Sequence, residues 1–170
     1  MQLTGRQIVD RGIIKGFSDN AIQQQGVDVR VESIRQVTAE NELAEIRWGS
    51  VPKEGKTFLP FYTDVEVEDD KYYLYPGYYD IELMESCEIP NNATLHYKTR
   101  SSLVRCGAIV HSGQFDAGFK TENMGCFLEV INPIVIEKGA RIAQAIVFES
   151  YPVDGKDMYN GQWQNDNQRK

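Results

Sequence analysis

The sequence predicts an all-β protein folded as a β-barrel or jelly roll, and two observations support this. Runs rich in β-branched and aromatic residues recur along the chain, separated by Gly, Asn or Pro, as short strands are by their turns. After Gly16 the helical period is lost. Many short strands at such spacing are typical of barrels and jelly rolls.

The one helix that we expect lies at the N-terminus. In TGRQIVDRG, Thr4 can accept a hydrogen bond from the third helical amide while Gln7 reaches back, which is a capping box. This helix should end near Gly12 or Gly16.

The predicted strands follow in order. In VDVRVESIRQV, Val27, Val29 and Val31 alternate with polar residues, as in a half-buried strand. In YYLYPGYYDIELM, Pro76-Gly77 marks a turn between two aromatic-rich strands. The remaining runs are ATLHYK, GAIVH, GCFLEVIN, IVIEKG and RIAQAIVFES.

Length and composition limit the class of protein. At 170 residues the chain suits one domain with a substantial core. It has no run of about 18 apolar residues and begins with polar residues, so we expect neither a membrane span nor a signal peptide. Three cysteines without a CxxC pair indicate reduced thiols and a cytoplasmic protein.

The charge is acidic overall but unevenly distributed. A net charge of −7 argues against nucleic-acid binding. Residues 98–141 hold six basic and four acidic side chains, so this segment is +2 and the remainder −9. Such a segment suits a small polyanion, although this number of basic residues is also close to that of an average surface.

Several familiar catalytic motifs are absent. Zinc deaminases need HxE and PCxxC, and nucleophile-elbow hydrolases need GxSxG. The phosphate loop GxxxxGK[ST] and a strand–GxGxxG–helix unit are also missing. The sequence therefore excludes the common nucleotide-binding folds.

The segment TRSSLVR is a candidate phosphate-binding site. Arg100 and Arg105 can form bidentate, charge-assisted bonds with phosphate oxygens, while the hydroxyls of Ser101 and Ser102 fill the gaps. They could also be ordinary surface residues.

The turn FDAGF is a candidate catalytic site. Asp116 could orient a water molecule and deprotonate it for attack on phosphorus. Gly118 would let the backbone approach a ligand, and Phe119 offers a flat face to a base or a sugar. A simple β-turn aspartate is the alternative.

The C-terminal segment after Asp154 is polar and carries Trp163. A frayed terminus is the usual fate of such residues. An exposed indole is unfavourable, however, so an arm that docks over a ligand is the other interpretation.

TRSSLVR and FDAGF resemble the second and third motifs of the dUTPase and dCTP deaminase superfamily. QQGVDVRV resembles its first motif, PGYYDIELMESCEIPNNA the hairpin before the phosphate loop, KGARIAQAIVF the fourth motif, and YNGQWQ the C-terminal arm. The resemblance spans residues 4–164 and is strongest to archaeal-type dUTPases.

The resemblance implies a distorted jelly-roll-like barrel over residues 1–152 and a flexible arm over 153–170 that closes over an active site. It also implies a homotrimer with sites at the subunit interfaces. The implied activity is dUTP hydrolysis to dUMP and diphosphate, with Asp116 activating the water and Mg²⁺ held mainly through the triphosphate, without direct protein ligands. Asp28 would anchor the site. The implied substrate-binding residues are Arg100, Ser101, Ser102, Arg105, Gly118, Phe119, Gln144, Tyr159, Gly161 and Trp163.

Two other activities remain open. The loop HSGQFD is two residues shorter than the HVTAGWID-like loop of dCTP deaminases and lacks its Thr-Ala, which favours hydrolysis. Glu129, however, occupies a position like that of the deaminases' proton-shuttling glutamate, so a dCTP deaminase or a bifunctional enzyme is an alternative. Glu129 could instead pair with an arginine or face solvent. The third possibility is a catalytically silent nucleotide-binding regulator.

Overall fold

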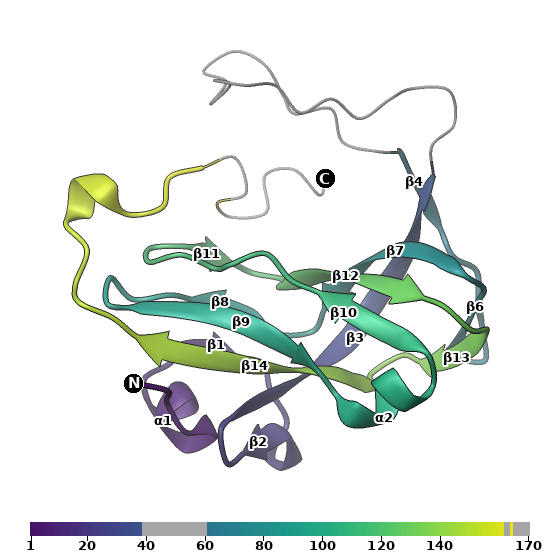
Figure 1. Cartoon of the computed structure of the whole chain (residues 1–170), viewed down its shortest axis with the longest axis horizontal. Coiled ribbons are helices and arrows are strands. Elements are labelled where there is room, and N and C mark those ends of the chain that lie inside the picture. Colours follow the sequence, from purple (N-terminus) through teal and green to yellow (C-terminus); the bar gives the residue numbers. More distant parts are fainter. Residues whose placement is uncertain (39–60, 162–163, 165–170) are drawn as a thin grey trace.

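The computed structural model describes residues 1–38, 61–161 and 164, and in these ranges the chain is mostly β (Figure 1). Two short helices, α1 (Gly5–Asp10) and α2 (Ser101–Arg105), and two 3-10 turns, η1 (Asp19–Ala21) and η2 (Gly155–Asp157), interrupt the strands. The strands are β1 (Ile14–Lys15), β2 (Ile22–Gln23), β3 (Gly26–Thr38), β4 (Phe61–Asp64), β5 (Val67–Glu68), β6 (Lys71–Leu74), β7 (Gly77–Leu83), β8 (Ser86–Glu88), β9 (Ala93–Thr99), β10 (Ala108–His111), β11 (Lys120–Thr121), β12 (Gly125–Val130), β13 (Ile134–Glu137) and β14 (Arg141–Glu149).

The main sheet curls into a nearly closed barrel. Its strands run in the order β10-β12-β7-β3-β14-β9, and β2 and β4 also pair with β3. The two ends of this path meet, because the Thr99 hydroxyl accepts from the Val110 amide at 3.0 Å and Leu95 bridges Phe115. Two three-stranded sheets, β1-β8-β11 and β13-β6-β5, complete the described fold. The all-β barrel prediction is confirmed.

The N-terminal helix is also confirmed, with its cap. The Thr4 hydroxyl accepts from the Gln7 amide at 3.2 Å, and the Gln7 side chain accepts from the Thr4 amide at 3.0 Å. The second helix, α2, has no signal in the sequence analysis. It is a single turn whose Leu103 packs into the core, so it is too short to show a helical period.

The predicted strands are present, but two local expectations are wrong. Strand β3 was expected to be half-buried, yet Asp28 is buried as well as Val27 and Val29, because β3 lies at the centre of the main sheet. The segment 76–93 does not form a hairpin: β7 pairs with β3 and β12, whereas β8 pairs with β1 and β11. No helix in the described ranges has the length and apolar character needed to cross a membrane.

Candidate active site

The segment that carries Arg100 lies where β9 ends and α2 begins. Arg100 is the N-cap residue of α2, and its backbone amide donates to the Ile142 carbonyl at 3.1 Å. Its guanidinium Nη1 donates to the Arg141 carbonyl at 3.3 Å. These bonds fix α2 to strand β14. The predicted phosphate-binding residues that follow are on the surface: Ser101, Ser102 and Arg105 are all exposed.

Beneath this segment, a buried carboxylate holds two guanidinium groups. Asp28 is 2% exposed, and its Oδ2 lies 3.4 Å from Arg100 Nε and 3.3 Å from Arg141 Nη1. Burial raises the pKa of the Asp28 carboxyl, while the two nearby guanidinium groups lower it. Asp28 on β3 therefore lies close to both guanidinium groups, and it reaches Arg100 across β14. Arg141 was not among the predicted site residues, and its only signal in the sequence is its place at the start of the RIAQ run.

Gln144 lies beside Asp28, since the two residues are directly opposed across β14 and β3. Its side chain crosses over Gly26, where an added Cβ would lie 2.7 Å from Gln144 Cγ and 2.5 Å from the Ala145 carbonyl oxygen. Glycine at position 26 therefore leaves the room that the Gln144 side chain occupies. The structure thus brings together Asp28, Arg100, Arg141 and Gln144.

Asp116 lies in a tight turn after β10. Phe115 bridges Leu95, and the Phe119 amide donates to the Asp116 carbonyl at 3.0 Å to close the turn. Gly118 has a φ of +87°, which favours glycine. The Asp116 carboxylate is exposed and accepts from Gln114 Nε2 at 2.5 Å. The turn therefore presents a carboxylate to solvent on a rigid backbone.

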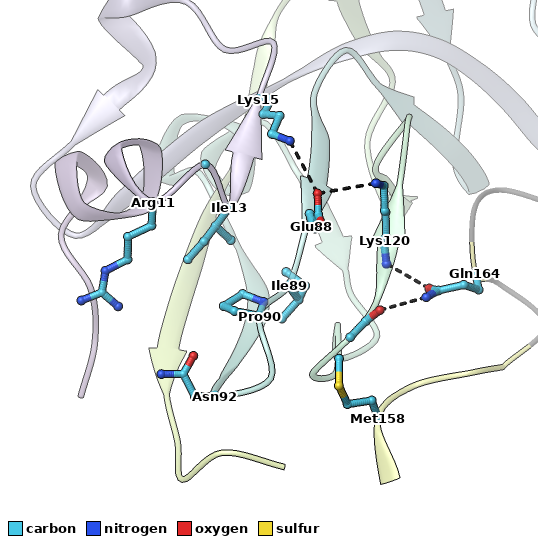
Figure 2. Close-up of a pocket in the computed structure, with 12 residues that line it drawn as sticks. Arg11, Ile13, Lys15, Glu88, Ile89, Pro90, Asn92, Lys120, Met158 and Gln164 are labelled. Atoms are coloured by element: carbon cyan, nitrogen blue, oxygen red, sulfur yellow. Dashed lines mark hydrogen bonds and ion pairs between the residues drawn. The ribbon is translucent and has the colours of Figure 1, made fainter. Parts of the chain in front are cut away.

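The described part of the C-terminal arm packs on this turn of its own chain. The Tyr159 amide donates to the Ala117 carbonyl at 2.8 Å. The Gln164 side chain donates to the Gly118 carbonyl and accepts from the Lys120 amide, both at 2.9 Å (Figure 2). The Tyr159 ring meets Phe119 edge-on at 5.3 Å, and Gly161 lies against the Tyr159 ring. Trp163 lies outside the described residues.

A cavity of about 670 Å³ lies between the arm, β8 and the segment after α1. On one wall, Glu88 Oε2 lies 3.6 Å from Lys15 Nζ and 3.5 Å from Lys120 Nζ (Figure 2). Of the predicted site residues that the structure describes, only Gly118 lines it. The side chains of Lys15, Glu88 and Lys120 are thus already paired with one another. Asp28, Arg100 and Arg141 do not line this cavity.

The arginine cluster and Asp116 lie toward opposite ends of β9. Asp116 follows the residue that bridges Leu95, near the start of the strand, whereas Arg100 follows its end. Arg100 follows Leu95 by five residue steps of extended chain, a length of about 16 Å. The two groups of predicted site residues, which we call the half-sites, are therefore separated within one chain.

Glu129 faces outward from β12 and has a histidine partner. Its Oε2 lies 2.8 Å from His111 Nε2, and both side chains are about half exposed. Nearby, the rings of Tyr78 and Phe127 stack at 5.3 Å with an angle of 4° between their planes. Burial raises the pKa of Tyr78. Glu129 therefore lies at the edge of a small aromatic surface.

Comparison with known proteins identifies the family. The family model described as dCTP deaminase-like matches residues 2–151. This chain belongs to the dCTP deaminase-like family.

Two of the curated relatives of this chain come from archaea. A protein of Methanocaldococcus jannaschii named deoxyuridine 5'-triphosphate nucleotidohydrolase is 32% identical over 91% of this chain and 96% of the relative. A protein of Aeropyrum pernix named as a probable enzyme of the same kind is also 32% identical, over 96% of this chain and 98% of the relative.

A solved structure gives the same fold for this dCTP deaminase-like chain. The 2'-deoxycytidine 5'-triphosphate deaminase of Agrobacterium tumefaciens matches 86% of the chain with a TM-score of 0.60 and 19% identity. The present chain spans 47% of that protein's length.

In the described ranges, no three His, Cys, Asp or Glu side chains lie close enough together to hold a metal ion.

Proposed function

We propose that this chain is a dUTP diphosphatase, a nucleotide hydrolase that converts dUTP and water to dUMP and diphosphate. The observation that carries the proposal is the exposed Asp116 carboxylate, held on a fixed turn with a side-chain amide as its neighbour. Such a group can accept a proton from water. The names of the archaeal relatives support dUTP as the substrate.

In the proposed reaction, Asp116 orients a water molecule and takes its proton as the oxygen attacks the α-phosphorus. The bond from that phosphorus to the bridging oxygen breaks, and diphosphate leaves with the bonding electrons. Arg100, Ser101, Ser102, Arg105 and Gln144 would hold the phosphate chain and stabilise its growing charge. Asp28 would keep Arg100 in position, since it lies 3.4 Å from that guanidinium.

Mg²⁺ fits this proposal as an ion bound by the phosphate oxygens. It keeps several water ligands and needs few from protein, which suits a site whose described carboxylates form no cluster. When bound, it would neutralise part of the phosphate charge. On the other side of the site, Gly118, Phe119, Tyr159, Gly161 and Trp163 would contact the nucleoside, with the residue 153–170 arm over it.

We propose further that each site joins Asp116 and the arm of one copy to the arginine segment of another, in a homotrimer. The support is the separation of the two half-sites along β9 and the packing of the arm on its own Asp116 turn. Two inactive variants, Asp116→Asn and Arg105→Ala, test this. Equal amounts of the two variants are unfolded and reassembled together. In a cyclic oligomer each interface takes Asp116 from one copy and Arg105 from the next, so random mixing gives both intact residues to about one quarter of the interfaces. No recovery above the separate variants would place each site within one chain.

The activity itself is tested with purified protein, Mg²⁺ and either dUTP or dCTP, measuring diphosphate and ammonia together. We expect diphosphate from dUTP, no ammonia from dCTP, and loss of diphosphate release in Asp116→Asn. Nucleotide binding without release of diphosphate or ammonia would refute the enzymatic activity and favour a catalytically silent regulator.

A second candidate is a dCTP deaminase, alone or combined with hydrolysis. The observation that favours it is the Glu129–His111 pair beside the stacked Tyr78 and Phe127 rings. This arrangement could hold a base and move a proton at its edge. It predicts ammonia from dCTP and loss of that ammonia in Glu129→Gln, with dUTP hydrolysis retained in a bifunctional enzyme.

A further inference from the structure

A row of polar side chains crosses three neighbouring strands of the main sheet. Asp28 on β3 is directly opposite Gln144 on β14, and Gln144 is directly opposite Lys98 on β9. Directly opposed residues of antiparallel strands project from the same face, with Cβ atoms about 5 Å apart. The three side chains therefore form one continuous row, with Lys98 at its outer end.

Lys98 also shares this face with the arginine cluster. Arg100 follows it by two residues, and alternate residues of a strand lie on the same side of the sheet. The contact of Arg100 with Asp28 agrees with that geometry, since the two lie 3.4 Å apart. The ammonium group thus belongs to the same surface as the predicted phosphate-binding residues, although it lies outside the TRSSLVR segment.

Lys98 differs from the two arginines in its pairing. Asp28 neutralises part of the charge of Arg100 and Arg141, both of which it contacts. Lys98 is exposed, and among the described residues no carboxylate forms an ion pair with it. Lys98 therefore adds to this surface a positive charge that no described carboxylate neutralises and that can meet an anion. A lysine is a compact charge on a flexible stem, which can follow a phosphate group without a fixed geometry.

We propose that Lys98 is a further substrate-binding residue, which contacts the phosphate chain of the nucleotide together with Gln144. The inference rests on the proposed function, because it takes a nucleoside triphosphate as the ligand. Strand β9 would then contact phosphate directly through Lys98, in addition to the arginine segment and to Gln144 on β14.

The test compares Lys98→Ala with Lys71→Ala, a matched exposed lysine on β6 outside the row. In the full-length protein, Lys98→Ala should raise the KM for dUTP about tenfold, the loss expected for one charge-assisted contact. It should weaken binding of inorganic triphosphate, measured by calorimetry with Mg²⁺, by a similar factor. The kcat should stay near that of the wild type, and Lys98→Arg should recover most of the affinity. Lys71→Ala should match the wild type throughout.

Equal affinities in the Lys98→Ala and Lys71→Ala variants would overturn the role of Lys98. Binding of inorganic triphosphate does not depend on turnover, so the two proposals can fail separately. A wild-type protein that releases no diphosphate from dUTP, yet binds triphosphate tenfold better than Lys98→Ala, would refute the hydrolase and retain the binding residue.

Discussion

Replacing Gly118 by alanine should release the C-terminal arm and leave the barrel folded. Gly118 has a φ of +87°, a region that costs other residues about 1–2 kcal/mol. A Cβ there would lie 2.8 Å from Met158 Cε and 2.9 Å from Met158 Cβ. Both contacts are shorter than van der Waals contact, and they are relieved most simply when the arm moves away.

Overpacking against Met158, which undocking relieves, costs about 1–3 kcal/mol. A docking loss of about 1–2 kcal/mol within that range raises the population of the undocked arm roughly 5- to 30-fold. Trypsin cleavage after Lys156, which is exposed in η2 just before the docked residues, measures that population when opening is fast. The cleavage rate should rise by the same factor. The KM for dUTP should rise with it, because the arm would contact the nucleoside in the proposed site.

Gly113→Ala is the matched control, since Gly113 lies in the same connection and an added Cβ there meets no atom within 4 Å. This variant should be cleaved at the wild-type rate. If Gly118→Ala were cleaved no faster than Gly113→Ala, the close packing of Met158 on Gly118 would not hold the arm.

Three further substitutions test the barrel. Burial raises the pKa of Glu85 above its usual 4.5, so its contribution to the unfolding free energy is largest below that value and falls as pH rises through the raised pKa. In urea unfolding, the difference in unfolding free energy between the wild type and Glu85→Gln should therefore shrink as the pH rises. A difference that grows with pH would contradict a raised pKa. Gly26→Ala should destabilise by about 1–3 kcal/mol through overpacking against Ala145 and Gln144, seen as a lower Tm, and should raise the KM; an unchanged Tm would count against the close approach. Thr4→Ala should cost about 1 kcal/mol in urea unfolding by removing the cap of α1, whereas no loss would mean that Gln7 caps the helix alone.

Most of the longer strands could be predicted from sequence because each has a local signal, whereas the short β1, β2, β4, β5, β8 and β11 were not predicted. β9, β10, β12 and β14 are short runs of β-branched and aromatic residues bounded by turn residues, and α1 begins with a capping box. The candidate phosphate segment and the Asp116 turn were also proposed from local patterns, namely neighbouring arginines and a small-residue turn, and their roles stay predictions.

The rest depends on pairing between distant parts of the chain. The burial of Asp28 follows from the central place of β3 in the sheet, which no alternation pattern shows. Its contact with Arg141 joins residues far apart in sequence. The His111–Glu129 pair requires the register of β10 against β12, in which His111 is opposite Phe127 and therefore diagonal to Glu129. Such contacts become predictable only once the strand order is known.

The bonding of the two half-sites bears on how a complete site would form. The arginine segment is fixed to β14 and to the buried Asp28, and the Asp116 turn is closed by its own hydrogen bonds and by Gln164. Each half is therefore organised within a single chain, with its side chains already exposed at the surface. In the proposed assembly, copies would meet as rigid bodies, and little ordering entropy would be lost at the moment of contact. The arm would be the exception: on opening for substrate it would break its bonds with the Asp116 turn, whereas the turn would keep its own backbone hydrogen bond.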